Sequence, residues 1–377
     1  MTTTGERAGP AGAEGAEGAL PGFRTAWPDA VRVVLTALVI VHHCAVTYSH
    51  IPAWTYHEPP ADGSASLLDL VVVLNQAWFM GAFFLISGWF VPGSVDRHGV
   101  AGFVRGRLLR LGVPFLAFVL LLKPIYYLPA AGGQENPLWF ALTALDPGPL
   151  WFVLLLLVFS LVYAGLRAAG ALRPGGAPGR VPGVLAIAAA GLALGAVTWA
   201  WWVVVPNGTF WTVLPSAGSL PQYALCFALG VAGGRRGWFD RLRPRTGVTA
   251  AVIAVLLAPL LVGVGLLGGE AAAGGGTAIS AVAAVLHGLF ALCAIVVVLV
   301  AARRWLDRPG PRARFLSTNA YAVYVLHAPI VAWLGVALAA VTAPAAVKAL
   351  ILFALAAPLC WTAAAALRRI GPVRRIL

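Results

Sequence analysis

One pattern of apolar and polar residues repeats along most of the chain: a run of about twenty mostly apolar residues is followed by a short polar connection. A helix of that length spans a hydrocarbon layer about 30 Å thick and satisfies its own backbone hydrogen bonds, which lipid cannot do. The pattern therefore predicts an all-α fold, a polytopic integral membrane helical bundle of about ten transmembrane helices. The predicted spans are residues 28–48, 67–92, 111–129, 150–167, 182–205, 219–234, 246–267, 279–302, 317–341 and 345–366.

Composition and charge support the membrane class and set its orientation. Hydrophobic residues make up 60% of the chain and charged residues 10%, whereas a soluble domain has about 25% charged residues. A net charge of +13 would suggest nucleic acid in a soluble protein, but here the basic residues alternate between connections. All but two of the 26 lysines and arginines lie in the first tail or in every second connection, the exceptions being Lys123 and Lys348. The positive-inside rule then predicts cytoplasmic termini and no nucleic-acid partner.

The chain divides into three parts. Residues 1–27 are rich in Gly, Ala and Glu without an apolar segment and are predicted to be a disordered cytoplasmic tail. Residues 28–367 form the transmembrane bundle, and 368–377 form a basic cytoplasmic tail. No connection is long enough for a soluble catalytic domain, so any chemistry must lie within the bundle. The four cysteines all fall in apolar spans without metal-ligand spacing, so neither a metal site nor a permanently bound cofactor is predicted.

The first predicted helix carries the clearest candidate for chemistry. His43 follows Arg32 by eleven helical steps, which places it about 16 Å deeper in the membrane, with His42 beside it. Ionisable side chains at such depth are costly and often functional, although a hydrogen-bonded packing role is the alternative. Two adjacent histidines favour function. The two side chains are separated by about 100° around the helix, so they cannot serve one reacting centre equally.

Two further arginines follow the second predicted span. Arg107 and Arg110 are three residues apart and share a helix face. They are either ordinary positive-inside anchors or, together with Arg32, a cytoplasmic anion site able to hold phosphates through charge-assisted hydrogen bonds. Spacing alone leaves both interpretations open.

Several stretches taken together resemble a known family. They are Arg32 with His43, and residues 83–88, 107–114, 150–152, 222–239, 317–327 and 361–375. In this order, over about residues 28–377, they resemble the acyltransferase-3 family of membrane acyltransferases, particularly the branch similar to glucan biosynthesis protein C. The resemblance makes residues 28–367 a transmembrane acyltransferase bundle in a cell membrane, either the plasma or the inner membrane.

The resemblance implies O-acyl transfer from a cytoplasmic donor, expected to be acyl-CoA, to a hydroxyl of a glycan or another envelope or secreted acceptor. It implies that His43 is catalytic and that Arg32, Arg107 and Arg110 hold the donor's phosphates. An extended pantetheine arm is comparable in length to the separation of Arg32 from His43. His43 would act either as a general base or through a covalent acyl intermediate.

Other site residues and partners are less defined by the sequence. His42, Ser87, Tyr324 and His327 are candidates for lining the site. Besides the bilayer and the acyl donor, the expected partner is a hydroxyl-bearing acceptor, with carbohydrate favoured. Some relatives carry an extracytoplasmic hydrolase-like domain that this chain lacks, so it either modifies the acceptor directly or relies on a separate extracytoplasmic partner.

Two non-enzymatic alternatives remain at this stage. In a secondary transporter or flippase for an envelope precursor, the histidines and arginines would line a proton-coupled or anionic path. The absence of a convincing internal repeat weakens that interpretation. In a scaffold subunit of an envelope assembly, these residues would have no chemistry of their own.

Overall fold

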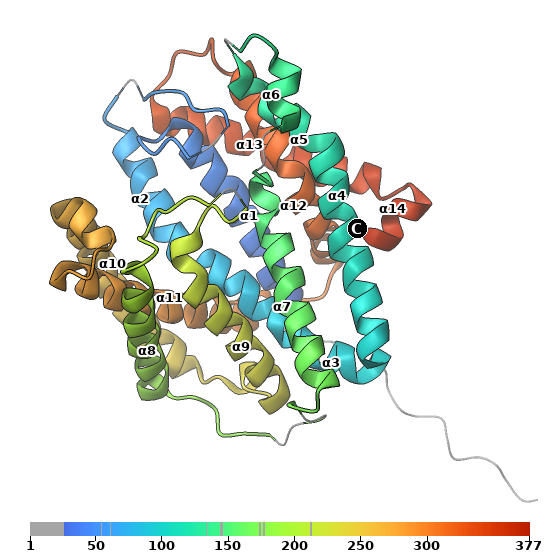
Figure 1. The fold of residues 1–377 in the computed structure, drawn as a ribbon, viewed down its shortest axis with the longest axis vertical. Coiled ribbons are helices and arrows are strands. Elements are labelled where there is room, and N and C mark those ends of the chain that lie inside the picture. The colour runs from blue at the N-terminus through green and yellow to red at the C-terminus, as the bar shows by residue number, and fades with distance from the viewer. Residues whose placement is uncertain are drawn as a thin grey trace, which may run out of the picture.

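The computed structural model describes residues 26–53, 55–60, 62–132, 134–143, 146–172, 175, 178–211 and 213–377. Within these ranges the chain forms helices and no strand, so the prediction of an all-α bundle is confirmed (Figure 1). Most of the predicted tail 1–27 lies outside the described residues. The predicted tail 368–377 includes a short helix.

The helices follow one another along the chain with short connections. They are α1 (Trp27–Tyr48), α2 (Ala65–Gln76), α3 (Phe79–Arg107), α4 (Val113–Ala117), α5 (Lys123–Tyr127), α6 (Pro137–Thr143), α7 (Trp151–Ala168), α8 (Val184–Trp202), α9 (Leu220–Arg236), α10 (Pro244–Ala273), α11 (Ala278–Ala301), α12 (Pro311–Ala337), α13 (Ala345–Leu367) and α14 (Gly371–Ile376). Single wider turns at Leu108–Gly112 and Phe118–Leu122 join α3, α4 and α5 into one continuous helical path.

Among the described residues, 8 helical segments are long and apolar enough to cross a membrane. One of them, Ala65–Ala131, contains two of the predicted spans, 67–92 and 111–129. The predicted span 219–234 corresponds to α9, which has 17 residues and is shorter than those eight segments. Each predicted span except this short one therefore overlaps one of the eight long apolar segments.

The predicted span 67–92 is not one helix, and this is a correction. The helix stops at Gln76 and restarts at Phe79, because Trp78 adopts a non-helical φ of −142°. The break exposes the Ala77 carbonyl, which accepts a hydrogen bond of 2.8 Å from the Gln222 side-chain amide on α9. The break is therefore stabilised by a residue distant in sequence, which an apolar pattern does not reveal.

Helices α3 and α9 pack with their backbones in contact. A Cβ atom added to Gly230 would lie 2.1 Å from the Leu85 carbonyl oxygen, and one added to Gly88 would lie 2.4 Å from the Phe227 carbonyl oxygen. Small residues permit this approach, and in a membrane such close packing replaces the hydrophobic drive between helices. The α3–α9 pair therefore needs glycine at these positions.

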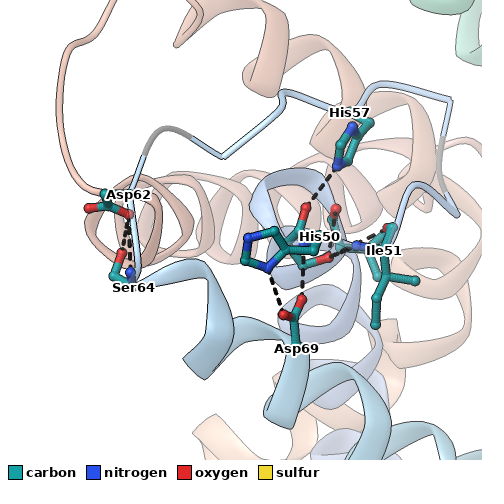
Figure 2. A network of polar contacts seen from close by, with 8 residues as sticks. His50, Ile51, His57, Asp62, Ser64 and Asp69 are labelled. Atoms are coloured by element: carbon teal, nitrogen blue, oxygen red, sulfur yellow. Dashed lines mark hydrogen bonds and ion pairs between the residues drawn. The ribbon is translucent and has the colours of Figure 1, made fainter. Parts of the chain in front are cut away.

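The connection between α1 and α2 is held by a network of polar contacts (Figure 2). His50 bonds Asp69 of α2 through its backbone N–H (2.9 Å) and its ring Nδ1 (2.7 Å). Asp62 accepts from the Ser64 hydroxyl at 2.7 Å and from the backbone N–H of Ala345 at 3.2 Å. The second bond caps the start of α13, and these bonds lower the pKa of the Asp62 carboxyl, that from Ser64 most. The connection is thus attached to two helices.

An ion pair also links this connection to α13, and it gives a stability prediction. The Lys348 ammonium is 2.5 Å from Glu58 Oε1 and lies over the Tyr48 ring, and its side chain is 4% exposed against 30% for Glu58. Glu58→Ala should lower the free energy of unfolding by about 2 kcal/mol, less than a fully buried pair because Glu58 is partly solvated. Lys348→Met should cost less, since it leaves no buried charge.

Thermal unfolding of the purified variants in one detergent measures this difference. The double variant Glu58→Ala/Lys348→Met serves as the control and should be more stable than Glu58→Ala alone. Equal loss in the two single variants would show that the pair is held by packing and not by charge.

Candidate active site

A cavity of about 830 Å³ lies at the end of the bundle that carries the connection between α1 and α2. Its described lining comes from α1, the α2–α3 break, α5, α7, α8, α10, α11 and α12, together with residues 51–53, Thr55 and segments near residues 146–149 and 207–219. Three histidines line it, His42, His43 and His287, whereas no lysine or arginine of the described chain does. The described wall of the cavity therefore carries imidazoles that can accept a proton, but no lysine or arginine charge.

His43 lies on the cavity wall in the second half of α1. Because α1 is continuous from Trp27 to Tyr48, the separation of about 16 Å from Arg32 predicted by helical rise holds in the structure. The His43 Nδ1 lies 2.9 Å from the Val39 carbonyl oxygen. A carbonyl can only accept, so this bond assigns the ring proton to Nδ1 and the lone pair to Nε2. Nε2 is then the atom able to take a proton.

His327 of α12 lies next to His43, although the two residues are far apart in sequence. Their ring centres are 5.0 Å apart, and His327 is fully buried. Its Nδ1 donates to the Tyr324 carbonyl at 2.6 Å, and its Nε2 has no hydrogen-bond partner among the described residues. The Tyr324 hydroxyl donates to the Pro149 carbonyl, and its side chain lines the cavity. Of the candidate lining residues, Tyr324 thus lines the cavity, whereas His327 lies against His43 and is not among the described lining residues.

His42 and His43 both line the cavity, and which of them faces the acyl donor stays a prediction. Their rings are 5.4 Å apart and nearly perpendicular, at 88°. His42 also stacks on Phe79, the first residue of α3, at 5.2 Å. The cavity extends around this side of α1 because α3 begins at the break after α2, and so both imidazoles reach it.

The arginines form a separate group. Arg107 is half-buried with its guanidinium over the Phe103 ring at 5.0 Å, and Arg110 is exposed. The Arg110 carbonyl accepts from the Tyr321 hydroxyl at 2.7 Å, a bond made available because Pro114 has no N–H to donate in the helix. Tyr321 therefore anchors this group to α12, six residues or about 9 Å of helical rise from His327.

Arg32 has a partner of its own and does not join that group through a direct contact. Its guanidinium pairs with Asp29 at 3.1 Å, and the side chain is 37% exposed. Within the described chain, no hydrogen bond or ion pair connects it to Arg107 or Arg110. Ser87 is half-buried on α3 and is not among the residues that line the cavity.

His287 of α11 also lies on the cavity wall. Its Nε2 lies 3.0 Å from Gln222 Oε1, and the Gln222 amide donates in turn to the Ala77 carbonyl. Because Gln222 Oε1 can only accept, His287 Nε2 carries the proton in this arrangement. Intramembrane placement was the only sequence feature pointing to His287, since no motif surrounds it.

An acyltransferase domain family model matches residues 25–365, which is nearly the whole chain. The chain belongs to the acyltransferase-3 family. No curated protein and no solved structure matches it. Membership in this family, together with the apolar helices, makes the chain a multi-pass membrane protein and supports acyl transfer as its chemistry. The match is to the acyltransferase-3 family as a whole, so the branch similar to glucan biosynthesis protein C stays a prediction.

Proposed function

We propose that this acyltransferase-3 protein moves an acyl group from cytoplasmic acyl-CoA to a hydroxyl of a glycan or another envelope or secreted acceptor. The observation that carries the proposal is His43, an imidazole on the wall of the cavity whose Nδ1 bond leaves Nε2 as the basic atom. Residues 28–367 would form the acyltransferase bundle in the plasma or inner membrane.

The proposed orientation has both termini in the cytoplasm and about ten crossings. The path Ala65–Ala131 would cross twice, and α9 would cross once in addition to the seven other long helices. The alternation of basic residues supports this arrangement. After replacement of the native cysteines, a cysteine at Asp62 should react with a reagent added outside. Reaction only from the cytoplasmic side would overturn the orientation.

The donor would bind with its charged end near the cytoplasmic surface and its thioester at the histidines. Arg107 and Arg110, with Arg32, would hold the phosphates. The pantetheine arm would then cover the distance of about 16 Å along α1 to His43. This arrangement keeps the phosphates at the surface while the reacting carbonyl enters the bundle.

In the direct mechanism, the acceptor oxygen attacks the thioester carbonyl as His43 Nε2 removes the hydroxyl proton. The tetrahedral intermediate then breaks its C–S bond, and the thiolate leaves with the proton from His43. The products are an ester and free coenzyme A. In the covalent alternative, His43 Nε2 attacks the carbonyl first, and the C–S bond breaks to release the thiolate. The alcohol oxygen then attacks the acylimidazole, the C–N bond to His43 breaks, and the alcohol's proton goes to the thiolate. The Tyr324 hydroxyl already donates to Pro149, so stabilisation of the oxyanion falls to another donor in this arrangement.

Release of thiol by the purified protein tests the proposal. The protein in detergent or liposomes is given acetyl-CoA or succinyl-CoA, and free coenzyme A is measured with and without an alcohol. Thiol release that depends on the protein supports the enzyme. A transporter or flippase would move a substrate without releasing thiol, and a scaffold subunit would do neither.

The donor site gives a second prediction. Arg107→Ala and Arg110→Ala should each raise the KM for acyl-CoA about tenfold, since a charge-assisted hydrogen bond contributes about 1.5–3 kcal/mol. Use of the matching acyl-pantetheine, which lacks the nucleotide phosphates, should change far less. Steady-state kinetics with both donors measures the difference.

Arg105→Ala is the matched control, because Arg105 is exposed and lies about 200° around the helix from Arg107. Its donor KM should stay close to that of the wild type. Folded Arg107 and Arg110 variants with unchanged KM would leave these residues as positive-inside anchors.

A further inference from the structure

His42 is a buried imidazole with no hydrogen-bond partner in the part of the chain that the structure describes. Its side chain is 9% exposed, its Nδ1 is enclosed, and neither ring nitrogen bonds another described residue. Buried polar groups are nearly always hydrogen-bonded, and leaving one unsatisfied destabilises the fold. Stacking on Phe79 gives the ring of His42 a packing partner, but it gives the ring nitrogens no hydrogen bond. Because Nδ1 is enclosed, Nε2 is the nitrogen of this cavity-lining ring that a ligand in the cavity would reach.

The position of His42 beside the proposed base restricts that ligand. The two ring centres are 5.4 Å apart and the rings are nearly perpendicular. A ring nitrogen bonds a hydroxyl oxygen at about 3 Å, and oxygens on adjacent carbons lie about as far apart as two hydrogen-bonded oxygens, about 2.8 Å. One molecule can therefore place one hydroxyl at His43 and the neighbouring hydroxyl at His42.

The rest of the cavity suits a polar acceptor. Its volume of about 830 Å³ falls within the usual range for small-molecule sites. Polar side chains on its wall include Gln76, whose amide donates to the Ser216 hydroxyl at 3.1 Å, and His287. Trp151 and Trp202 add aromatic surfaces. Polar groups thus surround a space large enough for a ring-sized molecule.

We propose that His42 is a specificity-determining residue that binds the hydroxyl next to the one being acylated, so that the acceptor carries two hydroxyls on adjacent carbons. This inference rests on the proposed function, because it concerns the acceptor side of the same site. Bonding by His42 orients the acceptor and directs a single hydroxyl to His43 Nε2.

Two isomeric alcohols test the inference without knowledge of the natural acceptor. Both 1,2-hexanediol and 1,6-hexanediol have two hydroxyls, including a primary one, but only the first has them on adjacent carbons. The wild-type protein, supplied with whichever of acetyl-CoA or succinyl-CoA it consumes faster, should acylate 1,2-hexanediol with a kcat/KM about tenfold higher or more, the effect of one additional hydrogen bond.

Variants assign that preference to His42. In His42→Phe, which keeps an aromatic ring against Phe79, the ratio of the two kcat/KM values should fall to about one. His42→Gln, which restores a hydrogen-bonding group, should recover part of the ratio. His98→Phe makes the same substitution at an exposed histidine outside the cavity and should keep the full ratio.

The following results would overturn the inference. Equal use of the two diols by the wild type overturns the inference, and that measurement needs no variant. A ratio that persists in folded His42→Phe overturns it too. If the wild type releases thiol yet acylates neither diol, the inference fails while the proposed function stands. If it consumes no acyl-CoA at all, both fail.

Discussion

Replacing His43 by alanine should lower acyl transfer by about 10²-fold or more while leaving the bundle folded, as expected for loss of a general base. The reason lies in the geometry of α1: the Val39 carbonyl orients the ring, so Nε2 is the basic atom on the cavity wall. Product formation from labelled acyl-CoA measures the loss in kcat, and thermal unfolding measures folding.

The matched control for this experiment is His98→Ala, which removes an exposed histidine whose ring Nδ1 bonds the Ser94 carbonyl of its own helix. It should keep transfer near the wild-type level. His42→Ala should act differently from His43→Ala, with its main effect on the KM for the acceptor. Near-normal transfer in folded His43→Ala would remove the proposed mechanism, whether direct or covalent.

Replacing Gly230 by alanine should destabilise the protein by about 3 kcal/mol, the upper end of the usual range for a substitution that overpacks a tight interface. The new Cβ would lie 2.1 Å from the Leu85 carbonyl oxygen, and backbone cannot rotate away as a flexible side chain can. Helices α3 and α9 would have to separate, and Gln222 would lose its position against Ala77. Thermal unfolding and size-exclusion profiles in one detergent measure the loss.

Gly263→Ala provides the control, because no atom lies within 4 Å of the Cβ that it would add on α10. Alanine is a better helix former than glycine, so that variant should be as stable as the wild type or more so. If Gly230→Ala matched Gly263→Ala in stability, the close approach of α3 and α9 would not be needed for folding.

Local features of the sequence determined the class of the fold and the separation of two candidate site residues, Arg32 and His43, along α1. Apolar runs of membrane-spanning length predict helices, because lipid offers no partner to a free backbone group. The separation of Arg32 from His43 follows from helical rise within one uninterrupted element, and α1 is continuous as predicted. These predictions needed only short-range geometry. The resemblance to the acyltransferase-3 family, which rested on the order of the motifs, agrees with the family model that matches residues 25–365.

Only the tertiary structure decided which residues meet. It placed His327 of α12 beside His43 of α1, brought Gln222 to the break at Ala77, and put His287 on the cavity wall. A membrane helix is apolar on its lipid-facing and its protein-facing sides alike, so its pattern does not show which side meets a neighbour. Helix pairing is instead decided by close packing at glycines such as Gly230 and by single interhelical hydrogen bonds, and both depend on residues distant in sequence.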